Sequence, residues 1–158
     1  MGMFNNILVV CAGNICRSPT AEYLLKGKLK DKLESKQDGN HARNTISVSS
    51  AGLTALVGKP AEATATSIAL TNNVDMSAHQ GRQLNSALIA ENDLILVMEE
   101  RHLSDLLGQY PQARGKTFLL GKWIDNTEIP DPYRQSHEAF EHVYQLIDKS
   151  CAAWTKYI

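Results

Sequence analysis

The chain has 158 residues, a hydrophobic fraction of 43%, a charged fraction of 21% and a formal net charge of −1. This length and composition are typical of one globular domain, and so small a net charge gives no reason to expect nucleic acid as a partner. No apolar run approaches the ~20 residues that cross a bilayer, and the first residues lack a basic leader pattern. We therefore expect a cytoplasmic protein without stable membrane association.

Short apolar runs alternate with segments of helical character. Apolar or β-branched runs predict strands at residues 7–10, 45–49, 93–98 and 116–120. Helices are predicted at 19–32, 61–70, 99–107 and from Ser136 onward, with 31–44 as a surface connection. Ser136 can cap the final helix, whose apolar stripe comprises Phe140, Val143, Tyr144, Ile147, Cys151 and Trp154. Such alternation predicts an α/β fold, a parallel sheet with helices on both faces, and a ligand site beyond the carboxyl ends of its strands.

The loop after the first predicted strand reads Cys11-Ala-Gly-Asn-Ile-Cys-Arg17. Gly13 is expected to allow a turn that a Cβ would obstruct, and Asn14 tolerates a left-handed conformation. Such a loop can turn successive N–H groups inward and bind an anion. Ser18, as an N-cap before Pro19, predicts a helix whose positive end points into the loop. Together with the planar fork of Arg17, these features predict a cradle for a tetrahedral dianion.

Cys11 lies at the mouth of this cradle. A helix N-terminus and a nearby arginine favour the thiolate, which is the nucleophilic form of cysteine. The alternative, a buried structural cysteine, explains the whole string of strand, C-x-G-N-x-C-R-S-P and helix less well. Cys11 and Cys16 form only C-x4-C, with no second pair at zinc spacing, so no metal is expected.

A thiolate at this position would face the phosphorus of a phosphoester bound in the cradle. The oxygen that leaves then needs a proton, so a general acid is expected as well. The candidate is Asp131, which lies between Pro130 and Pro132 in the segment EIPDPYR. The two prolines stiffen the chain, so a carboxylate can be held over a site. On local sequence alone, an ordinary surface Asp-Pro turn is the more common outcome.

The chain resembles the bacterial type of low-molecular-weight protein tyrosine phosphatase. Residues 11–19 match the signature loop of that family and Asp131-Pro-Tyr133 its general-acid loop. Ser50-Ala-Gly-Leu53 and Ser77–Arg82 match further blocks, in family order and over essentially the whole chain. The resemblance implies a four-stranded parallel sheet with a phosphate-binding loop after the first strand, and a single phosphatase domain over residues 1–158. It also favours the general-acid role of Asp131.

The implied reaction hydrolyses protein phosphotyrosine and small aryl phosphates in two steps. Cys11 attacks phosphorus while Asp131 protonates the tyrosine oxygen, and water then hydrolyses the phosphocysteine with Asp131 as base. Arg17 and the N–H groups of 12–17 hold the phosphate oxygens, and no cofactor is required. The resemblance assigns phosphate contact to Ala12, Gly13, Asn14, Ile15 and Cys16, a hydrogen bond to the Cys11 sulfur to Ser18, a pocket wall to Tyr133, and support of the loop to Asn14, Ser50 and His79. This chain departs from the eukaryotic members, which carry an aromatic residue in the loop after the Ser-Ala block, and Leu53 or Leu56 is expected to line the pocket mouth instead.

Several alternatives accompany this interpretation. His79 could pair with the nucleophile, although a structural histidine is commoner, and the other four histidines are expected on the surface. Arsenate reduction would require further thiols around residues 80–90, where there is no cysteine, and Cys151 is expected to be buried. A phosphocarrier or a phosphotyrosine-binding module would not need Asp131. The substrate implied by the resemblance is a tyrosine-phosphorylated protein, such as a bacterial tyrosine autokinase linked to capsule or exopolysaccharide export.

Cys16 suggests redox sensitivity. An exposed Cys11 would be oxidised first, and Cys16, five residues on in the same tight loop, could resolve the sulfenic acid as a disulfide. The alternative is that Cys16 merely fills space with its thiol pointing away.

Overall fold

The computed structural model describes residues 4–35 and 45–158. Four parallel strands form one sheet in the order β2-β1-β3-β4. Their bounds are Asn6–Cys11 for β1, Ser47–Gly52 for β2, Leu94–Val97 for β3 and Thr117–Leu119 for β4. The predicted four-stranded parallel sheet is therefore confirmed, and β1, which leads into the loop that begins at Cys11, is one of its two central strands.

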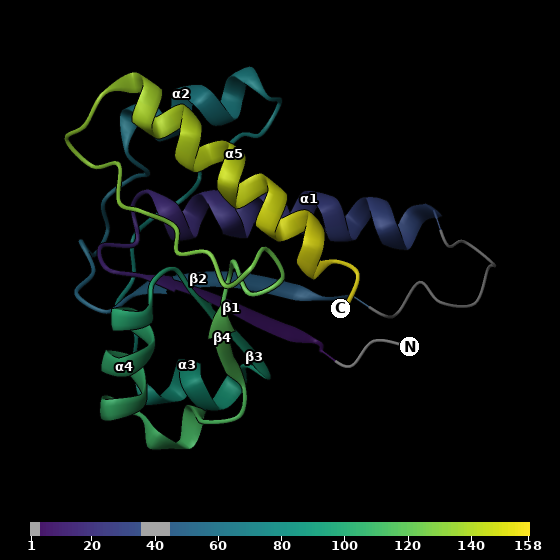
Figure 1. Cartoon of the computed structure of the whole chain (residues 1–158), viewed down its shortest axis with the longest axis vertical. Coiled ribbons are helices and arrows are strands. Elements are labelled where there is room, and N and C mark those ends of the chain that lie inside the picture. Colours follow the sequence, from purple (N-terminus) through teal and green to yellow (C-terminus); the bar gives the residue numbers. More distant parts are fainter. Residues whose placement is uncertain (1–3, 36–44) are drawn as a thin grey trace.

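Helices cover both faces of the sheet, as predicted (Figure 1). On one side lie α1 (Arg17–Ser35), α2 (Ala63–Thr71) and α5 (His137–Trp154). On the other side lie α3 (Ser86–Glu91) and α4 (Glu100–Gln109), followed by the 3₁₀ turn η1 (Pro111–Ala113). The long helices α1 and α5 lie on the same face of the sheet and pack against each other.

The side chains of β1 explain why its sequence is a continuous apolar run. Ile7 and Val9 pack into the core on the α1 and α5 side, whereas Leu8 and Val10 pack into the core on the α3 and α4 side. All four are fully buried. Because alternate side chains of a strand point to opposite faces, a strand between two helical layers must be apolar at every position. This packing fixes the strand whose carboxyl end carries Cys11.

The element boundaries differ from the predictions in informative ways. Helix α1 begins at Arg17, two residues before Pro19, so Ser18 lies inside its first turn. Strand β2 runs on to Gly52 because it pairs with β1 as far as Cys11. The six-residue helix α3 was not predicted, whereas the predicted cap of α5 is confirmed, since Ser136 Oγ accepts from the Ala139 N–H at 3.2 Å. The predicted surface connection at 31–44 is wrong for residues 31–35, which belong to α1, and its remainder lies outside the described residues.

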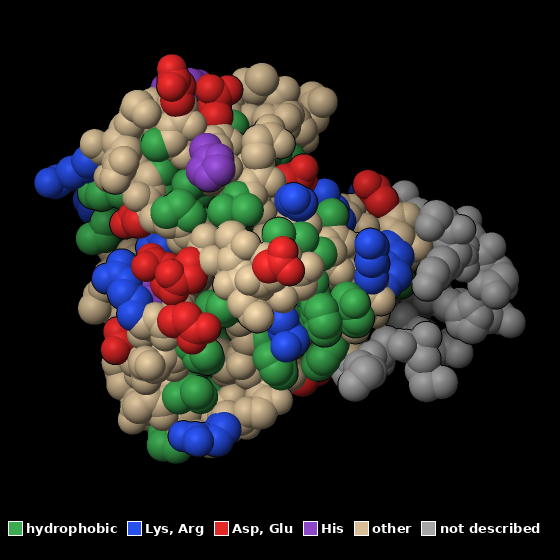
Figure 2. Space-filling model, viewed as in Figure 1, with side chains coloured by type: hydrophobic (Ala, Val, Ile, Leu, Met, Phe, Trp, Pro, Cys, Tyr) green, Lys and Arg blue, Asp and Glu red, His purple; other side chains and the backbone are tan. Residues whose placement is uncertain are grey.

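Figure 2 shows acidic and basic side chains intermixed on one face rather than separated into fields of one sign. This distribution agrees with the net charge of −1. Among the described residues, no helix is long and apolar enough to cross a membrane.

Candidate active site

The loop between β1 and α1 turns its carbonyl groups outward. Asn14 has the expected left-handed conformation, with φ of 60°. A Cβ on Gly13 would make only ordinary contacts, at 3.8 Å from Ile15 Cγ1 and 4.0 Å from Leu56 Cδ1. The expectation that a Cβ here would obstruct the turn is therefore wrong, because no protein atom stands in its way. Every carbonyl from residue 11 to 16 has a partner outside the loop: Leu53 N, Thr54 N, Leu56 N, His79 Nε2, Glu62 N and Thr20 N, in that order, at 2.7 to 3.2 Å.

The opposite side of the same peptide units faces the site. The N–H groups of residues 12–17 have no hydrogen-bond partner within the part of the chain that the structure describes. Successive unpaired N–H groups next to a helix N-terminus form an anion-binding concavity. The loop therefore has the shape of the anion-binding cradle that the sequence predicts.

Cys11 and Ser18 are in contact, with 2.9 Å between Sγ and Oγ. The expectation that Ser18 caps α1 is wrong, because its hydroxyl faces the sulfur and also accepts from Asn14 Nδ2 at 2.8 Å. The expectation of an exposed Cys11 is wrong as well, since the residue is only 3% exposed. Its limited surface lies inside a cavity, which restricts access to what enters that cavity.

Arg17 is buried among groups that come from distant parts of the chain. Its Nη1 donates to Glu99 Oε2 at 2.5 Å and to the carbonyl of Ile129 at 2.8 Å, while Nη2 lies 3.9 Å from Asp131 Oδ2. Two protein acceptors thus hold one end of the guanidinium. This fixed end orients the rest of the planar group within the site.

Glu99 was missed as a site residue because it was interpreted only as the start of a helix. It follows β3 almost directly, however, at the edge of the sheet where ligand sites are expected. Burial alone would raise the pKa of its carboxyl, but hydrogen bonds from Arg17 and Arg101 more than offset this and hold that pKa below its ordinary value. Glu99 is therefore an anion at neutral pH.

Asp131 lies at the mouth of the cavity, with a side chain that is 46% exposed. Its Oδ1 accepts from the Tyr133 N–H at 3.0 Å, so the segment does form the local Asp turn that was the alternative interpretation. That turn nevertheless directs the carboxylate towards Arg17. A local turn and a place in the site are thus compatible.

A cavity of about 270 Å³ brings together most of the predicted residues. Leu56 lies on its wall and Leu53 does not, because Leu53 packs into the core on the α3 and α4 side. Asn14 and Ser18 lie behind the wall, fully buried. Thr54 was not predicted. The complete lining is Cys11, Ala12, Gly13, Ile15, Cys16, Arg17, Thr54, Leu56, Asp131 and Tyr133.

A buried hydrogen-bond network supports the loop from behind. Asn14 Nδ2 donates to Ser50 Oγ at 2.9 Å, and Ser50 Oγ donates to Glu22 Oε1 at 2.5 Å. His79 Nε2 lies 2.7 Å from the Asn14 carbonyl, and its Nδ1 lies 4.0 Å from Glu22 Oε1. Ser50 and His79 thus support the loop, as expected. His79 does not pair with the nucleophile, because the polar partner of the Cys11 sulfur is Ser18. Glu22 was missed because nothing local in α1 indicates that its carboxylate points inward.

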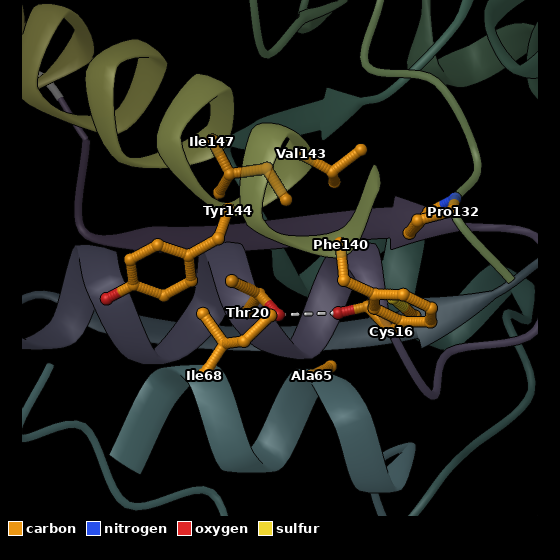
Figure 3. A pocket seen from close by; sticks show the side chains of 9 residues that line it. All are labelled: Cys16, Thr20, Ala65, Ile68, Pro132, Phe140, Val143, Tyr144 and Ile147. Atoms are coloured by element: carbon orange, nitrogen blue, oxygen red, sulfur yellow. Dashed lines mark hydrogen bonds between the residues drawn. The ribbon is translucent and has the colours of Figure 1, made fainter. Parts of the chain in front are cut away.

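Cys16 lines the site cavity and also a second, much smaller cavity, which is drawn in Figure 3. This cavity of about 10 Å³ is lined mainly by apolar side chains of α2 and α5, and Thr20 Oγ1 donates to the Cys16 carbonyl beside it. Burial, with the nearby Cys11 as a smaller cause, raises the pKa of the Cys16 thiol far above its ordinary range. Cys151 is completely buried, as predicted, and all three cysteines are free.

The surface position expected for His102 is wrong. It is 2% exposed, and neither ring nitrogen has a hydrogen-bond partner, although Nε2 lies 3.7 Å from Glu99 Oε2. Burial and then Arg17 lower the pKa of this imidazole, and the opposing effect of Glu99 does not compensate. His137 and His142 are exposed as expected, and His41 lies outside the described residues. Within the described ranges, no three His, Cys, Asp or Glu side chains are grouped so that they could hold a metal ion.

A cysteine and an arginine in an anion-binding loop at the carboxyl edge of a parallel sheet define a class of phosphate-binding α/β proteins. The sequence model of the low molecular weight phosphotyrosine protein phosphatases matches residues 6–158. Wzb of Salmonella typhimurium is 46% identical over 154 residues, covering 98% of this chain and 94% of that protein. Etp of Escherichia coli K12 is 43% identical over 153 residues, covering 97% and 94%. Both carry the name low molecular weight protein-tyrosine-phosphatase.

Solved structures give the same result. The structure of Vibrio vulnificus Wzb in complex with benzylphosphonate superposes with a TM-score of 0.87 at 50% identity, covering 98% of this chain and 99% of that chain. The chain belongs to the low molecular weight protein-tyrosine-phosphatase family. It is a phosphatase of this family.

Proposed function

We propose that the protein hydrolyses phosphotyrosine in proteins, as well as small aryl phosphates, through a phosphocysteine on Cys11. The observation that carries this proposal is the single cavity lined by Cys11, Arg17 and Asp131 beside the inward N–H groups of 12–17. These groups supply a nucleophile, a cation and a carboxyl around one anion-binding concavity, which is the combination that phosphoryl transfer needs.

In the first step, the thiolate of Cys11 attacks phosphorus. The S–P bond forms as the P–O bond to tyrosine breaks, and the departing oxygen takes the proton of the Asp131 carboxyl. The 3.9 Å between Asp131 Oδ2 and Arg17 Nη2 supports this role, because it brings the carboxyl next to the group that would hold the phosphate.

In the second step, a water molecule attacks phosphorus and gives its proton to Asp131. The P–O bond forms, the S–P bond breaks, and the electron pair returns to the Cys11 sulfur as a thiolate. Ser18 Oγ, 2.9 Å from that sulfur, can donate a hydrogen bond that stabilises the leaving thiolate. Arg17 and the loop N–H groups stabilise the charge on the phosphate oxygens in both steps.

The aryl ring would lie between Leu56 and Tyr133, which line the cavity and are 45% and 42% exposed. Apolar walls of this kind suit the ring of phosphotyrosine better than the short side chain of phosphoserine. The benzylphosphonate complex of the Vibrio vulnificus relative supports the same class of ligand.

Two alternatives receive less support. Arsenate reduction would need a relay of thiols, but residues 80–90 contain no cysteine and Cys151 is fully buried. A phosphocarrier or binding module would have no use for a carboxyl in the position of Asp131.

The deciding experiment measures phosphate release by the purified protein from a tyrosine-phosphorylated peptide and from its serine-phosphorylated counterpart. We expect catalytic release from the first and at most slow release from the second. Stoichiometric phosphorylation of the protein without turnover would instead indicate a carrier, and binding without chemistry a recognition module.

We further propose that the physiological substrate is a bacterial tyrosine autokinase linked to capsule or exopolysaccharide export, as the family resemblance implies. We also propose that residues 1–158 act as a single phosphatase domain in the cytoplasm, where a reducing environment keeps a catalytic thiol free. In a pull-down, the phosphorylated autokinase should be retained by Cys11→Ser and released by excess inorganic phosphate. Equal retention of the unphosphorylated kinase would count against this substrate.

A further inference from the structure

His102 is a buried polar residue to which the reaction above gives no role. It lies on α4, one turn after Glu99, and is 2% exposed. Both ring nitrogens lack a hydrogen-bond partner. A buried polar group without a partner costs about 1–3 kcal/mol, so its presence asks for an explanation.

One ring nitrogen of His102 lies close to the site, because Nε2 is 3.7 Å from Glu99 Oε2. That same oxygen accepts the hydrogen bond from Arg17 Nη1. The imidazole therefore stands on the protein side of the carboxylate that fixes one end of the phosphate-binding guanidinium.

A second arginine, Arg101, also binds this carboxylate, and its Nη2 donates to the oxygen that Arg17 holds, Glu99 Oε2, at 3.4 Å. Arg101 donates through Nε to Glu99 Oε1 at 3.1 Å, and its side chain is 66% exposed. Solvent and Arg101 both favour an outward position of Glu99, because a carboxylate loses hydration when it is buried. Arg17 holds the inward position through Nη1, and a further polar group on the buried side would add to that hold.

We propose that His102 is a positioning residue of the phosphate site, which holds the Glu99 carboxylate inward and so fixes the direction of the Arg17 guanidinium. The Nε2–H tautomer presents a donor towards Glu99 Oε2 at a distance that a movement of less than about 1 Å closes to a hydrogen bond. An apolar side chain at position 102 would release the carboxylate towards Arg101, and Nη1 would then keep only the Ile129 carbonyl. This inference rests on the proposed function only in taking the cavity as a phosphate site.

The test measures binding of inorganic phosphate by isothermal titration calorimetry, and competitive inhibition by phosphate where turnover can be followed. We expect His102→Phe, which keeps a flat ring without a donor, to weaken phosphate binding about fivefold to twentyfold. His102→Gln, whose amide can reach the position of Nε2, should bind within about twofold of the wild type. The matched control is Leu106→Val, one turn further on α4 and also fully buried, which should lower the melting temperature and leave phosphate binding unchanged.

A double-mutant cycle tests whether His102 acts through Glu99. In a Glu99→Met background, which has no carboxylate to hold, His102→Phe should change phosphate binding by less than about twofold. ¹⁵N shifts of the imidazole should identify the Nε2–H tautomer in the wild type.

Three results would overturn the proposal. The first is unchanged phosphate binding in His102→Phe, and the second is the same loss with Glu99→Met already present. The third is an equal loss in Leu106→Val, which would reduce His102 to a packing residue. If the wild type itself bound no phosphate, the failure would be that of the proposed function, so the two can be told apart.

Discussion

Cys11 and Asp131 have separate tasks in the proposed reaction, so each can be removed alone. Cys11→Ser should lower kcat at least about a thousandfold, because a serine hydroxyl does not ionise near neutral pH and cannot replace the thiolate. Steady-state kinetics with p-nitrophenyl phosphate will measure the loss, and circular dichroism will check that the fold persists. Activity within tenfold of the wild type would contradict the nucleophile assignment.

Asp131→Asn should discriminate between leaving groups. A general acid matters most when the departing oxygen is most basic, so the loss should reach about 100-fold for an alkyl-substituted phenyl phosphate. For p-nitrophenyl phosphate, a good leaving group, we expect less than about tenfold. Equal losses for the two substrates would mean that Asp131, with its bond to the Tyr133 N–H, only shapes the loop.

Glu99 gives the stability of the protein a defined dependence on pH. Its pKa in the folded state lies below the ordinary 4.5, so folding favours the anion. Its stabilisation is therefore fully present above pH 4.5 and is lost as the pH falls through the lowered pKa of the folded state. Urea unfolding should show Glu99→Gln less stable than wild type by about 1–3 kcal/mol at pH 7, with the gap narrowing in acid. A gap that widened in acid would have the wrong sign.

The proposed resolving role of Cys16 stays a prediction. Cys11 and Cys16 line the same cavity, and burial keeps Cys16 protonated, so peroxide should attack Cys11 first. Dithiothreitol should restore the activity of peroxide-treated wild type but little of that of Cys16→Ser, whose Cys11 would pass on to sulfinic acid. Mass spectrometry of the 11–16 peptide will identify the product. Full recovery of Cys16→Ser would leave Cys16 as a space-filling residue.

At the scale of elements, the end of β2 and the phosphate loop touch through their backbones. A Cβ on Gly52 would lie 2.5 Å from the carbonyl oxygen of Ala12, and backbone cannot move aside as a flexible side chain can. Gly52→Ala should therefore displace the loop, lower kcat/KM more than about tenfold and cost about 1–3 kcal/mol of stability. The control is Gly108→Ala on α4, where a Cβ meets no atom within 4 Å. If both variants behaved alike, the contact at Gly52 would have no special role.

The elements that could be predicted are those whose own sequence determines them. Strand β1 is buried on both sides from Ile7 onward and is therefore apolar over that run, and α5 carries both its cap and its stripe. Helix α3 has only six residues, too few for a periodic pattern, although Asn85 caps it by accepting from the Leu88 N–H. Asn85, as a candidate N-cap, is the local signal in the sequence that indicates the start of α3.

The site residues divide in the same way. Cys11, Arg17 and Asp131 belong to motifs that can be read locally or by resemblance. Glu99 lies 82 positions from Arg17 in the sequence, so no pattern of neighbouring residues could predict their contact. The choice between Leu53 and Leu56 also depended on tertiary contacts, because the Leu56 N–H donates to the Gly13 carbonyl and brings that residue to the cavity.

For the whole molecule, the order of the strands joins distant parts of the chain at one edge. The loop at 11–17 follows the first strand, whereas Ile129 and Asp131 come after the last strand of the sheet. The bond from Arg17 to the Ile129 carbonyl spans 112 positions. A contact of such long range requires the intervening chain to be closed into a loop, which costs conformational entropy.

This span has a consequence for synthesis on the ribosome. A nascent chain that has emerged as far as residue 120 carries Cys11 and Arg17 but neither the carbonyl of Ile129 nor the carboxyl of Asp131. Helix α5, which packs against α1, emerges later still. During translation the Cys11 thiol and its partner Ser18 therefore emerge before Ile129 and Asp131, so an oxidant present then would meet a site that is not yet complete. The cavity lining is complete only after residue 133, when about five-sixths of the 158 residues have emerged.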